Sequence, residues 1–545
     1  MSELDQLLQL QLRDYIENRL GKEVWINVYD RGHFCALIPE RQVAGALDRA
    51  GWDLSIGDGK PGCSIRYQDG EDIVEYSRFN TYGIEPLVIV RDFHGMRPSY
   101  VELLEEFRLF HNLYHDPRDG TYIKIDDDGE EDVVVRYTDR SVEMKLVPIR
   151  QFLAMKDMFL AIFFDSVVDS QKFSPEDIDA DKRHVTVKSA ELVYDFVVAE
   201  GIMSNRPSFS RLVGKKMIPP LPKEKSGIWP FSEQEEAEYA DFIIGTTEAG
   251  GVVTYPSNPD NLANYFGANP DAPHYLTPIY FKRDVLGKYY SNPDKYHIRD
   301  GYLGCGGLWG LRLDNNHDKY VIVFLGDLGR DLPYAEQLYW KSFNVAPEGG
   351  ISAVNYERSI RGRPADPSQP DLYFKYRFEL FRERWREQFG WDLFMPLSEG
   401  DEHFYLALRV PLNDSQAEFD SQVLALTKVL VDSLNEKELK RYIGAVDANT
   451  KGISKFELFL RDKGFPHVDS AISLLRDIQG LRSTGVAHRK GSTYKKVAEA
   501  FDTKGRRLAE IFSEMLKHSA LVLEHLETHF IPTSGVGASS PEESA

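Results

Sequence analysis

The chain has 545 residues, of which 42% are hydrophobic and 12% aromatic, and its formal net charge is -21. A globular chain of this length is too long for one core, so we expect about two to four domains. The acidic balance excludes a general nucleic-acid coat protein, whose affinity comes from many distributed Lys and Arg side chains. Any contact with nucleic acid is therefore local.

The cysteines and the N-terminal residues predict a soluble, cytoplasmic protein with no membrane contact. Cys35, Cys63 and Cys305 are far apart and form no CxxC pair, which is typical of a reducing compartment. Residues 1–21 mix charged residues into their apolar pattern, unlike a signal peptide. The most apolar run, residues 155–168, contains charged residues and is too short to cross a bilayer.

The fold class we expect is a multidomain α+β protein, and its N-terminal domain, residues 1–225, is a mixed α/β region that is a possible sensor. Apolar spacing indicates both helices and short strands there. An acidic turn containing Asp128-Gly129 is typical of a hairpin. Helices are expected at residues 4–20 and 100–114, and strands at residues 24–28, 34–38, 86–91, 121–125 and 133–137.

Residues 226–410 are predicted to form a β-rich middle domain with many Gly, Tyr and Trp residues. Its longest helix is expected at residues 372–389, where aromatic side chains recur at intervals of three and four before Gly390. We interpret this stripe as core packing and not as a base-stacking platform. Strands are expected at residues 274–281 and 319–325.

A glycine-rich stretch, residues 301–310, lies in this middle region. It misses the dinucleotide-binding fingerprint, because Trp309 takes the third glycine position after Gly304 and Gly306. A close approach of backbone within a sheet is the favoured interpretation, and a small-ligand loop is the alternative.

Residues 411–531 are predicted to form an all-α helical bundle, followed by a disordered tail at residues 532–545. Asn413 followed by Gln416 resembles a capping box at the start of the first helix. Helices are expected at residues 413–435, 453–462, 468–484, 494–501 and 505–529.

We expect no metal and no cofactor. Two histidine pairs stand four residues apart, but neither belongs to a His-Glu-x-x-His motif with a third ligand. Asp132 with Glu143 and Lys145 imitates a nuclease metal site, yet alternation along a solvent-facing strand gives the same pattern. The histidine pairs are His111 with His115, and His525 with His529.

The stretch at residues 481–490 contains Arg482 and His488, a cation and an acid/base six positions apart. This spacing alone indicates nothing, because three other Arg-to-His pairs in the chain match it. The surroundings favour this pair: it follows an amphipathic helix, and the segment 476–517 holds ten Lys and Arg residues against five acidic ones. The other pairs are Arg108 with His115, Arg312 with His317, and Arg461 with His467.

Helix geometry constrains how these two side chains can meet. In an unbroken helix a separation of six residues leaves side chains about 120° apart and roughly 9 Å along the axis. Arg482 and His488 then do not share one phosphate. The helix must end or loosen near Gly485, or the two residues meet partners across a dimer interface.

Residues 481–488, inside a C-terminal helical bundle, resemble the Arg-x(4–6)-His motif of HEPN domains. These domains occur in prokaryotic toxins, abortive-infection proteins and other antiphage defence systems, and many are ribonucleases. Active members usually carry Asn, Asp or His after the arginine, where this chain has Ser483.

The resemblance implies a metal-independent endoribonuclease that forms a homodimer through its bundle and is regulated by the large N-terminal region. RNA supplies the nucleophile, its 2′-hydroxyl, so cleavage needs an acid/base and a cation near the phosphate. His488 fits the first role and Arg482 the second. A phage-derived or small-molecule trigger is the expected signal. Supporting and RNA-binding roles fall to Ser483, Thr484, Arg489, Lys490, Lys495 and Lys496.

Two other functions remain open. The first alternative is a non-catalytic HEPN-like bundle that dimerises or binds RNA or a protein partner. The second is an enzyme or small-ligand-binding protein whose site lies in the middle domain.

Overall fold

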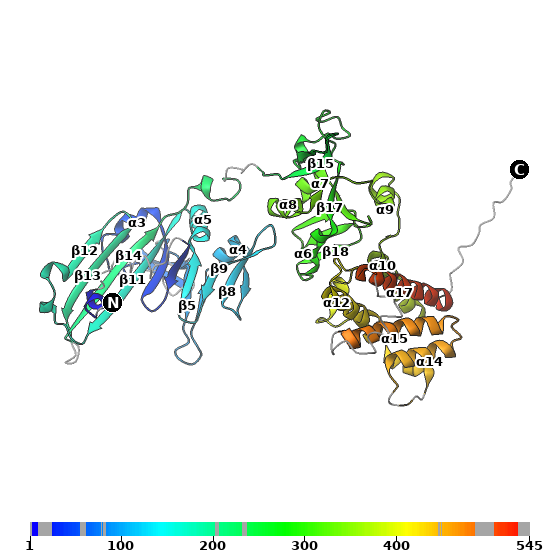
Figure 1. The fold of residues 1–545 in the computed structure, drawn as a ribbon. Helices are drawn as coiled ribbons and strands as arrows, with labels where there is room; N and C mark the ends of the chain where they lie inside the picture. Colours follow the sequence, from blue (N-terminus) through cyan, green and yellow to red (C-terminus); the bar gives the residue numbers. More distant parts are fainter. Residues whose placement is uncertain are drawn as a thin grey trace. The chain divides into compact units, whose positions relative to one another are not determined.

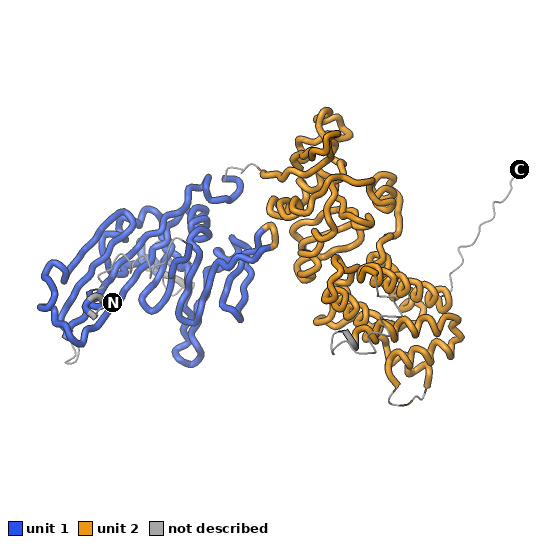
Figure 2. The backbone as a smooth tube through the Cα atoms, viewed as in Figure 1, with its two compact units in different colours: residues 1–126, 130–236 blue, residues 127–129, 237–545 orange. Residues whose placement is uncertain are grey.

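The fold was obtained as a computed structural model (Figure 1). The structure describes residues 3–8, 24–54, 62–77, 79, 83–201, 207–231, 237–444, 447, 450–485 and 506–531. The chain divides into two compact units (Figure 2). The first comprises residues 1–126 and 130–236, and the second comprises residues 127–129 and 237–545. With β-sheets in the N-terminal and middle regions and helices mainly in the C-terminal half, the chain is an α+β protein.

The first unit is built mainly of antiparallel strands. The described strands are β1 (Trp25–Tyr29), β2 (His33–Pro39), β3 (Gly62–Gln68), β4 (Glu71–Ser77), β5 (Val88–Arg91), β6 (Tyr100–Leu103), β7 (Tyr114–Asp116), β8 (Thr121–Ile125), β9 (Glu131–Tyr137), β10 (Val142–Lys145), β11 (Met158–Ser170), β12 (His184–Lys188), β13 (Leu192–Glu200) and β14 (Ser208–Ile218). They form two five-stranded sheets, ordered β1-β10-β9-β8-β7 and β12-β13-β14-β11-β2, and the hairpins β3–β4 and β5–β6. The described helices of this unit are α1 (Glu3–Leu8), α3 (Glu40–Ala46), α4 (Glu105–Phe110) and α5 (Leu146–Lys156).

The long strand β11 organises the second of these sheets. It coincides with the most apolar run of the sequence and pairs with β14 from Leu160 to Ser170. Because side chains alternate across a strand, Leu160, Ile162 and Phe164 enter the core that both sheets share, whereas Ala161 faces the smaller core beneath α3.

The predicted helix at residues 100–114 is wrong in its extent, because only α4, residues 105–110, is helical. The segment forms β6, the short helix α4 and β7. β6 pairs antiparallel with β5, so that Tyr100 lies opposite Arg91 and Leu103 lies opposite Val88. Leu104 stays extended before α4, and Asn112 beyond the helix has a positive φ of 50°, which is incompatible with a continuing right-handed helix. Tertiary strand pairing therefore overrides local helical spacing here.

The middle part of the second unit contains small antiparallel sheets and short helices. Its strands are β15 (Asp241–Thr246), β16 (Val252–Pro256), β17 (Pro278–Lys282), β18 (Tyr296–Arg299), β19 (Tyr302–Cys305), β20 (Trp309–Arg312), β21 (Tyr320–Phe324) and β22 (Asn344–Val345). They pair as β15-β16, β21-β17-β22 and β18-β19-β20. The helices are α6 (Gly287–Tyr290), α7 (Leu325–Asp331), α8 (Tyr334–Lys341) and α9 (Ala353–Asn355), and a π-helical turn (Tyr356–Ile360) follows α9.

The rest of the second unit is a helical bundle with one large apolar core. Its described helices are α10 (Pro370–Phe389), α11 (Glu402–Leu406), α12 (Gln416–Thr427), α13 (Glu436–Ile443), α14 (Gly452–Asp462), α15 (Val468–Gly485) and α17 (Leu508–Phe530). A π-helical segment, Lys428–Asp432, continues α12. The predicted helices at residues 453–462, 468–484 and 505–529 are confirmed, whereas the expected helix at 494–501 and the tail at 532–545 lie outside the described residues.

The aromatic stripe of α10 is core packing, as its spacing predicts. Phe374, Phe378, Phe381 and Trp385 are all buried in the bundle core. Gly390 ends the helix with a positive φ of 75°, a backbone conformation that glycine adopts without steric cost.

The predicted capping box at Asn413 and Gln416 is wrong by two residues. Ser415 is the N-cap of α12, and its hydroxyl accepts a hydrogen bond from the Glu418 amide at 3.3 Å. Asn413 instead accepts from the Ser415 amide at 2.9 Å and so shapes the turn before the helix.

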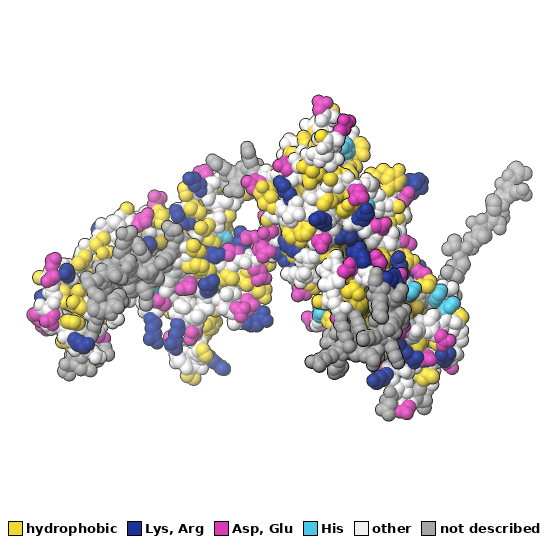
Figure 3. Space-filling view, in the orientation of Figure 1, with side chains coloured by type: hydrophobic (Ala, Val, Ile, Leu, Met, Phe, Trp, Pro, Cys, Tyr) yellow, Lys and Arg dark blue, Asp and Glu magenta, His cyan; other side chains and the backbone are white. Residues whose placement is uncertain are grey.

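Charges on the second unit are mixed. On the face drawn in Figure 3, its Lys and Arg side chains are interspersed with Asp and Glu. In the part of the chain that the structure describes, no helix has the length and apolar character needed to cross a membrane.

Candidate functional site

Arg482, the first residue of the predicted catalytic pair, lies in the last described turn of α15. Leu474, Ile478 and Leu481 are buried on the same helix, so Arg482 sits at the margin of the packed face. Ser483 and Thr484 continue the helix, but their side chains are outside the described part of the structure. His488, Arg489, Lys490, Lys495 and Lys496 also lie outside the described residues, so the distance between Arg482 and His488 stays a prediction.

The Arg482 guanidinium is held by the carboxylate of Asp432. One nitrogen, Nη1, donates to Oδ1 at 2.9 Å and to Oδ2 at 2.8 Å. Asp432 ends the π-helical segment that follows α12, and π-helical turns are frequent at functional sites. The two side chains are 32% and 33% exposed, so solvent reaches the pair.

The Nε and Nη2 nitrogens of the guanidinium take no part in this contact. Among the described residues, none accepts a hydrogen bond from Nε or Nη2 of Arg482. An arginine edge of two parallel N–H groups matches two oxygens of a phosphate. The described residues therefore hold the cation through one nitrogen and leave its Nε and Nη2 edge unpaired.

Asp432 was missed by sequence reasoning. It is fifty residues from Arg482, and the contact exists only because α15 packs against α12 and its π-helical continuation. No local motif around Asp432 indicates this pairing.

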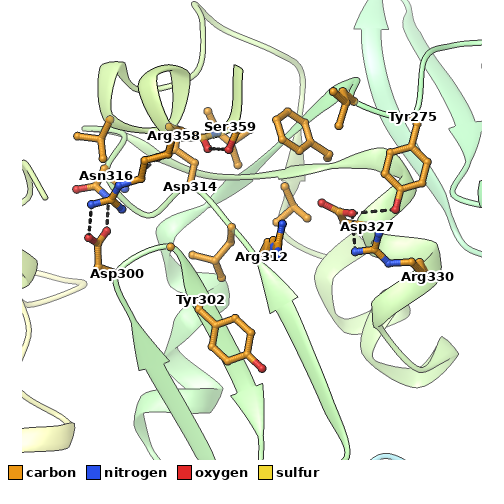
Figure 4. Close-up of a pocket in the computed structure, with 18 residues that line it drawn as sticks. Tyr275, Asp300, Tyr302, Arg312, Asp314, Asn316, Asp327, Arg330, Arg358 and Ser359 are labelled. Carbon is orange, nitrogen blue, oxygen red and sulfur yellow. Dashed lines mark hydrogen bonds and ion pairs between the residues drawn. The ribbon is translucent and has the colours of Figure 1, made fainter. Parts of the chain in front are cut away.

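A second candidate site is a cavity of about 600 Å³ in the middle part of the second unit (Figure 4). Residues of β19, β20, β21, α7 and the π-helical turn after α9 line it. Its size is that of pockets that hold small organic ligands. Charged side chains stand on both of its walls and between them.

One wall is built around Asp300. Its Oδ2 accepts from Arg358 Nη2 at 2.6 Å, and its Oδ1 accepts from the Asn316 amide at 2.6 Å. Arg358 also donates through Nε to the Ala365 carbonyl at 3.0 Å. Each of these side chains is therefore held in a fixed orientation by a partner.

The opposite wall is built around Asp327. The Tyr275 hydroxyl donates to its Oδ1 at 2.8 Å, and Arg330 pairs with the same oxygen at 2.9 Å. Burial raises the pKa of the Asp327 carboxyl, while the Tyr275 hydrogen bond and the charges of Arg330 and Arg312 oppose that shift. Arg330 is also paired with Asp331 at 2.6 Å.

Arg312 and Tyr302 are direct cross-strand partners in β20 and β19. In the view of Figure 4, Arg312 lies between the Asp300 wall and the Asp327 wall. None of the described side chains forms a hydrogen bond or an ion pair with its guanidinium. In the sequence, Arg312 stands out only through its spacing to His317, which matches by chance. The cavity around it is formed by tertiary contacts, which leave no local sequence pattern.

The glycines of residues 301–310 permit this packing. A side chain at Gly310 would collide with the Tyr302 hydroxyl, and one at Gly304 would collide with the His297 ring. The glycines thus make room for side chains of the same small sheet, whereas the prediction was a close approach of backbone. Gly326 gives the Tyr275 ring its space in the same way.

The histidine pair and the nuclease-like cluster of the first unit have structural partners. The His111 Nε2 donates to the Pro148 carbonyl at 2.9 Å, and the His115 ring lies 2.7 Å from the Tyr137 hydroxyl. Lys145 forms an ion pair with Asp132. Within the described ranges, no three His, Cys, Asp or Glu side chains gather in a metal-binding group.

Comparison with known proteins gives no relative for this chain. No protein-family model, no curated protein and no solved structure matches it.

Proposed function

We propose that the C-terminal bundle is a HEPN-like, metal-independent endoribonuclease that acts in prokaryotic antiphage defence. The observation that carries this proposal is the Arg482 guanidinium, which Asp432 anchors through Nη1 and whose Nε and Nη2 edge has no partner among the described residues. That edge is the group an RNA phosphate requires, and it stands in a segment whose sequence is basic within an acidic chain.

The chemistry follows from RNA itself. The 2′-hydroxyl attacks the adjacent phosphorus, the bond to the 5′-oxygen breaks, and a 2′,3′-cyclic phosphate forms. His488 takes the 2′-hydroxyl proton or returns one to the leaving 5′-oxygen, since imidazole titrates near neutral pH. Arg482 stabilises the charge that develops on the phosphate oxygens.

A homodimer gives each active cleft two copies of the motif. This assembly also removes the constraint that Arg482 and His488 meet within one helix. The large first unit has the role of a sensor that restrains the bundle until a phage-derived or small-molecule trigger binds.

The experiment compares RNA cleavage by the wild type, Arg482→Ala and His488→Ala in the presence of EDTA. We expect each variant to lose about 100-fold or more in rate, and the wild type to keep its activity in EDTA. Arg476→Ala is the matched control, because Arg476 lies on the same helix and pairs with Glu457 at 2.5 Å.

Two outcomes speak against the proposal. Undiminished cleavage in both motif variants contradicts the assignment of the catalytic pair. A wild type that binds RNA through Arg482 but cleaves none in infected cells supports the non-catalytic alternative.

A further inference from the structure

The cavity between the Asp300 and Asp327 walls contains three arginines, and their environments differ. Arg358 is engaged by Asp300 at 2.6 Å, and Arg330 is engaged by Asp327 and Asp331. Arg312 forms no hydrogen bond or ion pair with any described residue, and its charge acts on Asp327 only from a distance. The cavity therefore has one cation whose donors are available to a bound molecule.

The available cation lies beside an aromatic ring. Tyr302 is directly opposite Arg312 on the neighbouring strand, so both side chains leave the sheet on the same face. The Tyr302 ring extends across the backbone of Gly310 with its centroid 5.6 Å from that of the His297 ring, and the residue is 36% exposed. In Figure 4 the Tyr302 ring points away from Arg312, so a molecule that contacts both groups must extend from one to the other along this face of the sheet.

The carboxylates on both walls of the cavity are already held in place by hydrogen bonds and ion pairs. Asp300 is fixed by both Arg358 and the buried Asn316, and Asp327 is fixed by Tyr275 and Arg330. Side chains already held by such hydrogen bonds lose little conformational entropy when a ligand binds. A cavity of about 600 Å³ also exceeds the space that a lone phosphate fills.

We infer that this cavity binds an anionic ligand of mononucleotide size, with its phosphate on Arg312 and its planar ring against Tyr302. Hydroxyl and amino groups of the ligand meet the oxygens of Asp300 and Asp327. The inference goes beyond the proposed ribonuclease activity and rests on residues other than those of the bundle, so either can fail without the other.

Binding is tested on the full chain by isothermal titration calorimetry. The probes are the four ribonucleoside 5′-monophosphates, the corresponding nucleosides and inorganic phosphate. We expect at least one monophosphate to bind, and to bind about tenfold or more tightly than its nucleoside and than phosphate.

Variants assign the contacts. Arg312→Ala is expected to weaken binding of that monophosphate by about tenfold or more, with Arg312→Lys retaining part of the affinity. Tyr302→Leu is expected to weaken it by about fivefold or more while leaving phosphate binding unchanged. The control is Arg363→Ala, which removes an exposed arginine of the same unit that does not line the cavity. Circular dichroism confirms that each variant is folded.

Three results overturn the inference. The first is no heat of binding for any monophosphate at millimolar concentration. The second is phosphate binding as tight as that of the nucleotide. The third is a folded Arg312→Ala variant whose nucleotide affinity equals that of the wild type.

Discussion

Arg482 and Asp432 meet through a single guanidinium nitrogen, which donates to both carboxylate oxygens at 2.9 and 2.8 Å. Because each side chain is about one-third exposed, solvent screening limits what the pair contributes to stability. Its main consequence is geometric. The carboxylate anchors Nη1, and no described residue contacts the Nε and Nη2 edge, to which the proposed function assigns a phosphate.

Asp432→Ala is therefore expected to lower ribonuclease activity without unfolding the bundle. The kcat should fall about tenfold, because a freely rotating guanidinium is less often aligned with the phosphate. The free energy of unfolding should fall by less than about 1 kcal/mol. RNA-cleavage kinetics and urea unfolding of the same preparations measure the two effects.

Asn at position 432 provides the control for positioning. Asp432→Asn keeps one oxygen acceptor for Nη1 and should retain more activity than Asp432→Ala. Equal losses of activity and stability in both variants would show that Asp432 has only a structural role.

In the first unit, loss of the ion pair of buried Lys215 should lower stability more than loss of an exposed ion pair. Its ammonium is fully buried and pairs with Asp53 at 2.6 Å, whereas Lys188 and Asp48, paired at 2.7 Å, are both exposed. Asp53→Ala leaves a buried charge without its carboxylate and should cost about 3 kcal/mol. Asp48→Ala should produce no resolvable change.

The urea concentration at which the first unit unfolds is measured for both variants. Protease cleavage of peptides from that unit reports its unfolding. Adding Lys215→Met to Asp53→Ala should recover most of the loss, because an apolar side chain of similar length needs no counter-ion. Similar midpoints for the Asp53→Ala and Asp48→Ala variants would contradict this prediction.

His111 makes the stability of the first unit depend on pH. Burial lowers the pKa of its imidazole from 6.5 to about 4, the hydrogen bond to Pro148 opposes this shift, and the charge of Lys124 adds to it. Between these two pKa values the unfolded chain binds a proton that the folded chain does not. Stability is thus present in full above the unfolded pKa and falls as the pH drops, by about 3 kcal/mol in total.

His111→Gln should flatten this pH dependence. The glutamine amide still donates to the Pro148 carbonyl but does not titrate, so the slope of unfolding free energy against pH should decrease within that window. The exposed His184 supplies the control, His184→Gln. The slope is the decisive measurement, since lost ring packing lowers stability at every pH; an unchanged slope in His111→Gln would refute the prediction.

Sequence patterns predicted elements that bury one face. The strands at residues 24–28, 34–38, 121–125 and 319–325 and the helix at 372–389 are confirmed. β1 alternates between buried and partly exposed residues, and α10 buries the aromatic residues that recur at helical spacing. The same reasoning failed at residues 100–114, where pairing between β5 and β6 decides the conformation.

The candidate sites were less accessible to sequence reasoning than the fold. Arg482 was identified from its basic surroundings, but its partner Asp432 is brought to it by the packing of α15 against the end of α12. Arg312 was discounted as a chance spacing, and only the pairing of β19 with β20 places it beside Tyr302. Contacts between residues distant in sequence leave no local pattern.

At the start of α12, the contributions of Ser415 and Asn413 to helix stability can be compared. The Ser415 hydroxyl satisfies the Glu418 amide, one of the first amides that has no partner within the helix. Ser415→Ala should cost about 1 kcal/mol, which corresponds to about fivefold faster hydrogen exchange across the first turns of α12. Asn413→Ala should cost less, because Asn413 stabilises only the preceding turn. Hydrogen–deuterium exchange of peptides covering residues 413–427 compares the two variants. A larger effect from Asn413→Ala would indicate that Asn413, and not Ser415, is the N-cap of α12.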